Sequence, residues 1–125
     1  MIKSVHHLAV LCSEREKALD FYCGALGFKT AETHLRPERN DEIIMLEGHG
    51  ITLELFVSPS NPPRVTSPEA YGLRHLAFCV TDIENEVRRL KEAGYAPEEI
   101  RCDTFTGEKM TFVKDPDGLP IELHE

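Results

Sequence analysis

Apolar and polar residues alternate along six short stretches of the chain, and this alternation is typical of β-strands with one buried face. The predicted strands cover residues 5–12, 42–46 and 51–57 in the first half and residues 74–80, 110–114 and 119–123 in the second. After the first strand of each half, apolar residues recur at helical spacing instead. These residues are Ala18, Leu19, Tyr22 and Leu26 in the first half, and Ile83, Val87 and Leu90 in the second. Each half is therefore predicted to form a strand, a helix and then two or three antiparallel strands.

Start and stop signals flank both helical patterns. A capping box of the form S/T-x-x-E precedes each pattern, and a glycine follows it. The residues are Ser13 with Glu16 and Gly27 in the first half, and Thr81 with Glu84 and Gly94 in the second. The turn sequence DPDG at 115–118 separates the last two strands.

The two halves share sequence landmarks at a constant separation. The segment HLAV at 7–10 recurs as HLAF at 75–78, and LEL at 53–55 recurs as IEL at 121–123. His7 and His75 are therefore 68 residues apart, as are Glu54 and Glu122. One offset shared by separate landmarks indicates two copies of a single module.

A proline-rich stretch separates the two copies. Residues 58–71 contain four of the chain's eight prolines, and proline suits neither a helix interior nor a central strand. We interpret this stretch as a linker between a module at 1–57 and a module at 72–125. The 125 residues suit one domain, 1–125, that contains both modules. The expected class is α+β, in which each module forms a curved sheet with its helix on the outer face.

Side-chain parity places four ionisable residues on the same kind of surface. They are His7, Glu54, His75 and Glu122. Successive side chains of a strand point to opposite faces, and the immediate neighbours of these residues along the strands are mostly apolar. Because the apolar neighbours must pack under the helices, the four ionisable side chains are expected on the opposite, open face.

Two imidazoles and two carboxylates form a suitable donor set for one divalent metal ion. Ni²⁺ or Zn²⁺ is expected first, and Co²⁺, Mn²⁺ and Fe²⁺ also accept such ligands. Taken singly, each of these residues is more simply a solvent-facing strand residue. The recurrence of both residue types at equivalent positions favours the metal site.

The remaining histidines lack such a counterpart. His6 has the opposite parity and is expected against a helix or at a sheet edge. His34 and His49 lie in polar stretches and are expected in solvent. His124 shares the face of Glu122 and is a candidate for supporting it from outside the ligand set.

Charge and composition exclude several classes of partner. The net charge of −8 would repel a nucleic-acid backbone, and no apolar stretch is long enough to span a bilayer. The four cysteines are widely spaced and form no C-x-x-C motif, so they are interpreted as reduced thiols. The first residues lead directly into a strand-like pattern rather than a signal peptide. We therefore expect a cytoplasmic protein that acts on a small molecule.

Together these motifs resemble the vicinal-oxygen-chelate superfamily, and within it the glyoxalase I (lactoylglutathione lyase) branch. Besides the two His–Glu repeats, the resemblance rests on three phrases. They are FYCGALGF at 21–28, GLRHLAF at 72–78 and the ending DPDGLPIEL at 115–123. The resemblance covers nearly the whole chain.

The resemblance implies an open, eight-stranded barrel around a metal ion, formed by two βαβββ modules, and a homodimer. It implies that His7, Glu54, His75 and Glu122 are the metal ligands. It also implies that Glu122 is the catalytic base, with Glu54 as a ligand and second candidate base. The implied reaction moves a proton on the hemithioacetal of a small 2-oxoaldehyde and a thiol.

Two positions depart from the glutathione-using members of the branch. Those members carry an Arg and an Asn where this chain has Leu11 and Ser58. The thiol is therefore left open by the sequence. The alternatives are a metal-dependent thiol or group transferase of the fosfomycin-resistance type, and a module that binds a small molecule without turnover.

Overall fold

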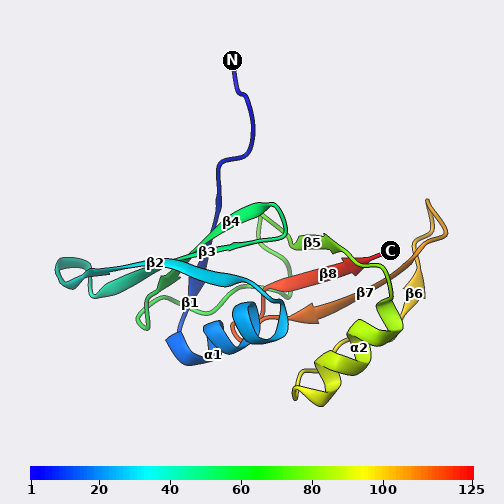
Figure 1. Ribbon diagram of the computed structural model, residues 1–125. Helices are drawn as coiled ribbons and strands as arrows, with labels where there is room; N and C mark the ends of the chain where they lie inside the picture. Colours follow the sequence, from blue (N-terminus) through cyan, green and yellow to red (C-terminus); the bar gives the residue numbers. More distant parts are fainter. The chain divides into compact units, whose positions relative to one another are not determined.

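The computed structural model describes residues 1–125, which fold as two compact units, Met1–Pro62 and Pro63–Glu125 (Figure 1). The first unit contains β1 (Leu8–Cys12), α1 (Arg15–Leu19), a π-helical segment η1 (Asp20–Ala25), β2 (Lys29–Arg36), a 3₁₀ turn η2 (Pro37–Arg39), β3 (Asp41–Gly48) and β4 (Ile51–Val57). The second contains β5 (Leu76–Cys79), α2 (Ile83–Glu92), β6 (Arg101–Cys102), β7 (Lys109–Lys114) and β8 (Pro120–His124).

Each unit has one four-stranded sheet, and the two sheets share a topology. The strand orders are β1-β4-β3-β2 and β5-β8-β7-β6. In both, the first strand pairs in parallel with the last strand, and the other pairs are antiparallel. Neither sheet closes on itself. The predicted α+β class with two βαβββ modules is confirmed.

The core of each unit lies between one face of its sheet and its helical segment. In the first unit, Leu53 and Leu55 of β4 and Phe21 and Tyr22 of η1 are completely buried. In the second, Ile121 of β8 is completely buried, and the side chains of α2 that are buried are Ile83, Val87 and Leu90. The alternation that predicted the strands thus selects the face that each helical segment covers.

The helix starts differ from the predicted capping boxes. The first helix has Glu14 at its N-cap position and no side-chain capping bond there. The second is capped by Asp82, whose carboxylate accepts a hydrogen bond of 3.0 Å from the backbone N–H of Asn85. Both predicted caps are therefore wrong by one residue. In the second helix the reason is that aspartate caps at least as well as the neighbouring threonine.

The first helix also changes character along its length. After Leu19 it continues as η1, where the N–H of Leu26 reaches back five residues to the carbonyl of Phe21. None of the helices has the length and apolar character needed to cross a membrane.

Gly48 allows β3 to pass close to Phe28. A Cβ atom at Gly48 would lie 2.9 Å from Cδ1 and 3.3 Å from Cα of Phe28, which is buried. We expect Gly48→Ala to lower the free energy of unfolding by about 1–3 kcal/mol, because the core must shift to admit the methyl group.

Gly24→Ala is the matched control for this change. A Cβ atom there would meet Asp20 Oδ1 at an ordinary 3.5 Å. The control should leave stability unchanged or raise it by up to about 1 kcal/mol, since alanine favours helical backbone over glycine. Urea denaturation of both variants checks this, and equal losses would contradict the packing assigned to Gly48.

Candidate metal centre

The first His–Glu pair lies on the open face of the first sheet. His7 directly precedes β1, and Glu54 lies in β4 opposite Ala9. The Nε2 atom of His7 is 3.3 Å from Oε2 of Glu54. Since Leu53 and Leu55 point into the core, Glu54 must point to the other face, as parity predicted.

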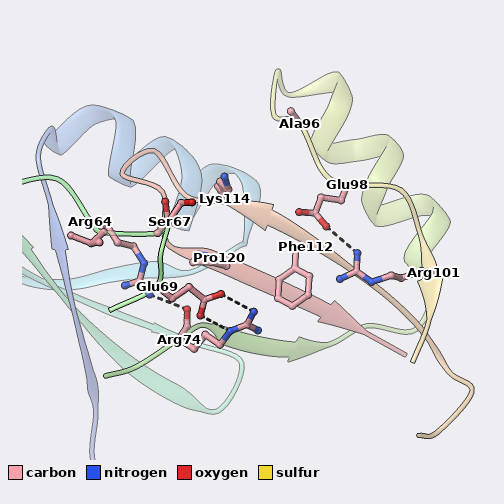
Figure 2. Close-up of a pocket in the computed structure, with 12 residues that line it drawn as sticks. Arg64, Ser67, Glu69, Arg74, Ala96, Glu98, Arg101, Phe112, Lys114 and Pro120 are labelled. Atoms are coloured by element: carbon pink, nitrogen blue, oxygen red, sulfur yellow. Dashed lines mark hydrogen bonds and ion pairs between the residues drawn. The ribbon is translucent and has the colours of Figure 1, made fainter. Parts of the chain in front are cut away.

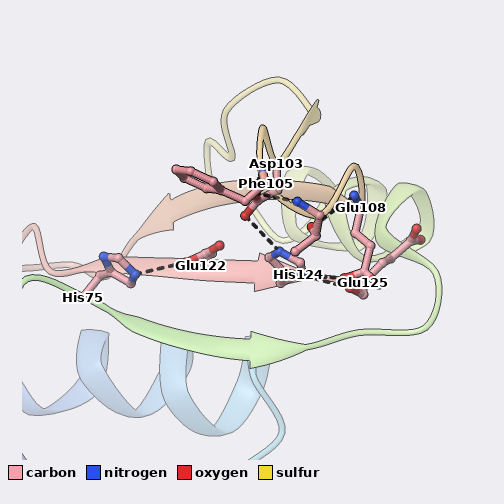
Figure 3. A network of polar contacts seen from close by, with 8 residues as sticks. His75, Asp103, Phe105, Glu108, Glu122, His124 and Glu125 are labelled. Atoms are coloured by element: carbon pink, nitrogen blue, oxygen red, sulfur yellow. Dashed lines mark hydrogen bonds and ion pairs between the residues drawn. The ribbon is translucent and has the colours of Figure 1, made fainter.

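The second pair repeats this arrangement in the second unit (Figure 3). His75 directly precedes β5, and Glu122 lies in β8 opposite Ala77. The Nε2 atom of His75 is 3.0 Å from Oε2 of Glu122, whose side chain is 12% exposed against 21% for Glu54. Phe112 of β7 lies opposite Glu122 and meets the His75 ring edge to face, with ring centroids 5.2 Å apart.

The spacing within each pair suits two neighbouring ligands of one metal ion. With bonds of about 2.1 Å to each atom, two ligands are about 3.0 Å apart at a right angle and about 3.4 Å apart at a tetrahedral angle. The observed 3.3 Å and 3.0 Å fall in this interval. Imidazole nitrogen and carboxylate oxygen are also donors that Ni²⁺ and Zn²⁺ accept.

One nitrogen of His75 has no hydrogen-bond partner. Its Nδ1 atom is buried and unpartnered, although a buried polar atom left unpaired costs about 1–3 kcal/mol. Such an atom in a folded protein calls for an explanation, such as a functional role or a bound ion or water. The ring is held by Glu122 and Phe112 rather than by a hydrogen bond at Nδ1, and this fits a residue placed for its chemistry.

Neither pair is a complete metal site by itself. No group of three or more His, Cys, Asp or Glu side chains that could hold a metal ion occurs in either unit. Each pair therefore supplies two donors, which is half of the predicted set.

His6 is not packed against a helix, contrary to one of its two expected positions. It is exposed, and its Nδ1 lies 2.8 Å from Nδ1 of His7. The two rings meet edge to face at 83°. His6 thus contacts His7, and this contact has no counterpart in the second unit, where Arg74 takes the position of His6.

His124 makes its contacts away from Glu122 (Figure 3). Its ring nitrogens lie 2.7 Å from the carbonyl oxygen of Glu125, 3.4 Å from Asp103 and 3.5 Å from Glu108. The carbonyl of Glu125, followed by the carboxylate of Asp103, raises the pKa of His124. The N–H groups of Phe105 and Thr106 lower the pKa of Asp103. His124 makes no hydrogen bond to Glu122, but the charge of Glu122 also raises the pKa of His124. The supporting role of His124 stays a prediction.

The other two histidines are exposed, as expected. His34 pairs with Glu32 at 3.0 Å. His49 is not simply solvated, because its Nε2 lies 2.6 Å from the carbonyl oxygen of Leu26 and its ring meets Phe28. None of the four cysteines forms a disulfide, in agreement with their spacing.

A pocket of about 690 Å³ adjoins the second pair (Figure 2). Phe112 and Pro120 line it, and Phe112 also contacts His75. Most of the other lining side chains are charged and come from loops or strand ends. The sequence pattern predicted the His–Glu pairs but not this pocket.

The sequence signature of the Glyoxalase/Bleomycin resistance protein/Dioxygenase superfamily matches residues 4–123. The chain belongs to this superfamily. Its members are usually enzymes, commonly use a divalent metal, bind small-molecule substrates and often form dimers. The resemblance to the vicinal-oxygen-chelate superfamily inferred from the sequence is thereby confirmed.

Three relatives show how the chain lies within the glyoxalase superfamily. The uncharacterized protein YwkD of Bacillus subtilis (strain 168) is 45% identical, with 100% of this chain and 98% of YwkD covered. The crystal structure of a glyoxalase family protein from Enterococcus faecalis is 47% identical, with a TM-score of 0.94 and 98% of each chain covered. Glyoxylase I 4 of Arabidopsis thaliana is 30% identical over 98% of this chain and 70% of its own.

Proposed function

We propose that His7, Glu54, His75 and Glu122 bind one divalent metal ion per chain, Ni²⁺ or Zn²⁺ before Co²⁺, Mn²⁺ or Fe²⁺. We further propose a glyoxalase I-like lyase that acts on the hemithioacetal of a small 2-oxoaldehyde and a thiol. One observation carries the proposal. The same His–Glu contact, at 3.3 Å and 3.0 Å, recurs at equivalent register positions on the open face of both sheets. Membership of the superfamily and the likeness to Glyoxylase I 4 support it.

The bound metal would stabilise the negative charge that develops on the substrate's oxygen atoms when a neighbouring C–H bond is broken. The chain itself must supply the group that takes this proton. Glu122 is the better placed carboxylate of the two, because it is less exposed than Glu54 and Phe112 lies opposite it.

In the proposed reaction, Glu122 removes the proton from the carbon that bears the hydroxyl and the sulfur. The same carboxylate returns a proton to the adjacent carbon, which was the carbonyl carbon. The hydroxyl proton ends on the oxygen of that adjacent carbon, so the product is a 2-hydroxyacyl thioester and no atom is gained or lost. Glu54 acts as a ligand and as the second candidate base, and His75 stays in place through its contact with Phe112.

The proposal also includes a cellular location and an oligomeric state. Four cysteines that form no disulfide support a cytoplasmic location, because reduced thiols persist there. The homodimer implied by the family resemblance stays a prediction. We also propose that the repeated modules span residues 1–57 and 72–125 and that residues 58–71 form the linker between them.

A panel of methylglyoxal hemithioacetals tests the reaction class. We expect the metal-loaded protein to convert at least one of them to the 2-hydroxyacyl thioester, with no clear preference for the glutathione adduct. The reason is that Leu11 and Ser58 carry no charge or amide for the tripeptide, and Leu11 is 57% exposed. Product analysis by mass spectrometry and absorbance measures this.

Two results would contradict this proposal. If no adduct is converted with any of the five ions, the lyase assignment is wrong, and a transferase or a non-catalytic binding protein remains. If the glutathione adduct is converted far better than the others, the interpretation of Leu11 and Ser58 is wrong.

A further inference from the structure

The pocket beside the second pair carries a charge opposite to that of the protein. The chain as a whole has a net charge of −8. The charged residues that line the pocket are Arg64, Arg74, Arg101, Lys114, Glu69 and Glu98. The lining therefore contains four cationic side chains and two carboxylates (Figure 2). A concentration of positive charge in a cavity attracts anions, since the low-dielectric walls focus the field.

Two of the four cations are already paired with carboxylates. Arg74 makes two hydrogen bonds to Glu69, of 2.7 Å and 2.9 Å. Arg101 makes one contact of 3.1 Å with Glu98. These pairs occupy both carboxylates of the pocket with hydrogen bonds from Arg74 and Arg101. The hydrogen bond from Arg74 and, to a smaller extent, the charge of Arg64 lower the pKa of Glu69.

Arg64 and Lys114 are the two cations of the pocket that make no hydrogen bond to a carboxylate. Arg64 donates from Nη2 to the backbone carbonyls of Leu73 and Arg74, at 2.9 Å and 3.0 Å, and has no carboxylate partner. Those two bonds fix the guanidinium without neutralising it. Lys114, at the end of β7, makes no ion pair. An oxyanion is the ligand that would neutralise both groups.

The pocket and the second His–Glu pair share a wall. Phe112 lines the pocket, lies 5.5 Å below the Arg101 guanidinium and contacts His75. Pro120 also lines the pocket and lies on the same face of β8 as Glu122. A molecule held in the pocket by an anionic end would therefore extend past Phe112 toward His75 and Glu122.

We propose that Arg64 and Lys114 bind an oxyanion of the substrate, a carboxylate or a phosphate, in this pocket. The substrate is then an anionic carbonyl compound or thiol adduct, and this part of the inference rests on the proposed function. The volume of about 690 Å³ is within the usual range for small-molecule sites. Recognition of the anion by the second unit is consistent with the uncharged Leu11 and Ser58 in the first.

Calorimetric titration of the full chain with inorganic phosphate, with malonate and with uncharged malonamide tests the pocket. We expect phosphate or malonate to bind, malonamide not to bind, and added salt to weaken binding. The better of the two anions identifies the phosphate or the carboxylate class. Titrations with and without a chelator separate this binding from binding to a metal ion.

Variants then assign the binding to the two cations. Lys114→Gln and Arg64→Gln should each weaken anion binding about 10-fold or more, since each removes a charged hydrogen-bond donor. Lys114 is exposed, so its replacement leaves the fold intact even if Arg64→Gln disturbs the loop. Lys91→Gln, which removes the same charge from the last turn of α2 in the same unit, should leave the affinity within about twofold.

The outcomes separate this inference from the proposed function. Failure of both anions to bind, or binding that Lys114→Gln does not weaken, would overturn the inference. If the wild type and Lys114→Gln both convert neutral and anionic hemithioacetals at equal rates, the anion-site inference is wrong and the lyase proposal is supported. If Lys114→Gln abolishes anion binding but the wild-type protein binds no metal ion, the proposed metal-dependent function is wrong and the anion site is supported.

Discussion

Replacing Glu122 with Gln should lower turnover by at least about 100-fold while the protein keeps much of its metal. A positioned carboxylate that takes the substrate proton contributes about 10² to 10⁴ to the rate, and the amide cannot take it. The amide oxygen keeps the shape of the side chain and one donor atom. The Glu122 side chain lies opposite Phe112 and near His75, whereas the core side chains of β8 are Ile121 and Leu123. The change should therefore leave the packing of this strand intact.

Steady-state kinetics with measured metal content checks this prediction. Glu99→Gln is the matched control, since Glu99 is an exposed glutamate of the same unit that does not line the pocket. The control should turn over like the wild type. A metal-loaded Glu122→Gln protein with near-normal turnover would rule out Glu122 as the base, and Glu54→Gln would then be the next variant to measure.

Replacing His75 with Ala should weaken metal binding by more than about 100-fold. Loss of a group that merely supports a metal ligand typically costs 10- to 100-fold in affinity, and loss of the ligand itself should cost more. The Nδ1 atom of His75 is buried and has no hydrogen-bond partner, so removing the ring also removes an unsatisfied polar atom. The fold should therefore lose less stability than the size of the side chain suggests.

Competition with a chromophoric chelator measures the affinity for Ni²⁺ and Zn²⁺. His34→Ala is the control, since His34 is an exposed histidine that pairs with Glu32 and belongs to neither His–Glu pair. It should keep the wild-type affinity within about tenfold. His7→Ala should behave like His75→Ala because the two pairs are equivalent. Unchanged affinity in either ligand variant would remove that residue from the site.

The sequence predicts much of what positions the site. Leu53 and Leu55 are both completely buried, so the parity of β4 alone directs Glu54 to the open face. In β8, Ile121 and Leu123 do the same for Glu122. The offset of 68 residues is informative because a repeated module repeats its register as well as its residues.

Two strands lacked a signal that alternation could detect. β2 has the sequence KTAETHLR and is exposed along nearly its whole length, so no apolar face marks it. β6 has two residues, both exposed. Each is one of the two edge strands of its sheet and is defined by pairing with β3 or β7 rather than by burial. The π-helical η1 likewise depends on a backbone pattern that spacing of apolar residues does not resolve.

The pocket could not be predicted because its residues follow no period. Arg64 comes from the proline-rich segment, Arg101 from the short β6 and Lys114 from the end of β7. These residues come together only in the folded chain. The net charge of −8 gives no indication of a local group of cations. The unpaired state of Arg64 and Lys114 is visible only when the partners of Arg74 and Arg101 are known.

We propose that His7, Glu54, His75 and Glu122 bind one metal ion in common. Equilibrium dialysis against Ni²⁺ or Zn²⁺ followed by elemental analysis tests it most directly, with the wild type and a His7→Ala/His75→Ala double variant compared by circular dichroism for folding. The expected result is about one tightly bound ion per wild-type chain and none in the folded double variant. A wild-type protein that binds no ion, or a double variant that binds as much as the wild type, would contradict the claim.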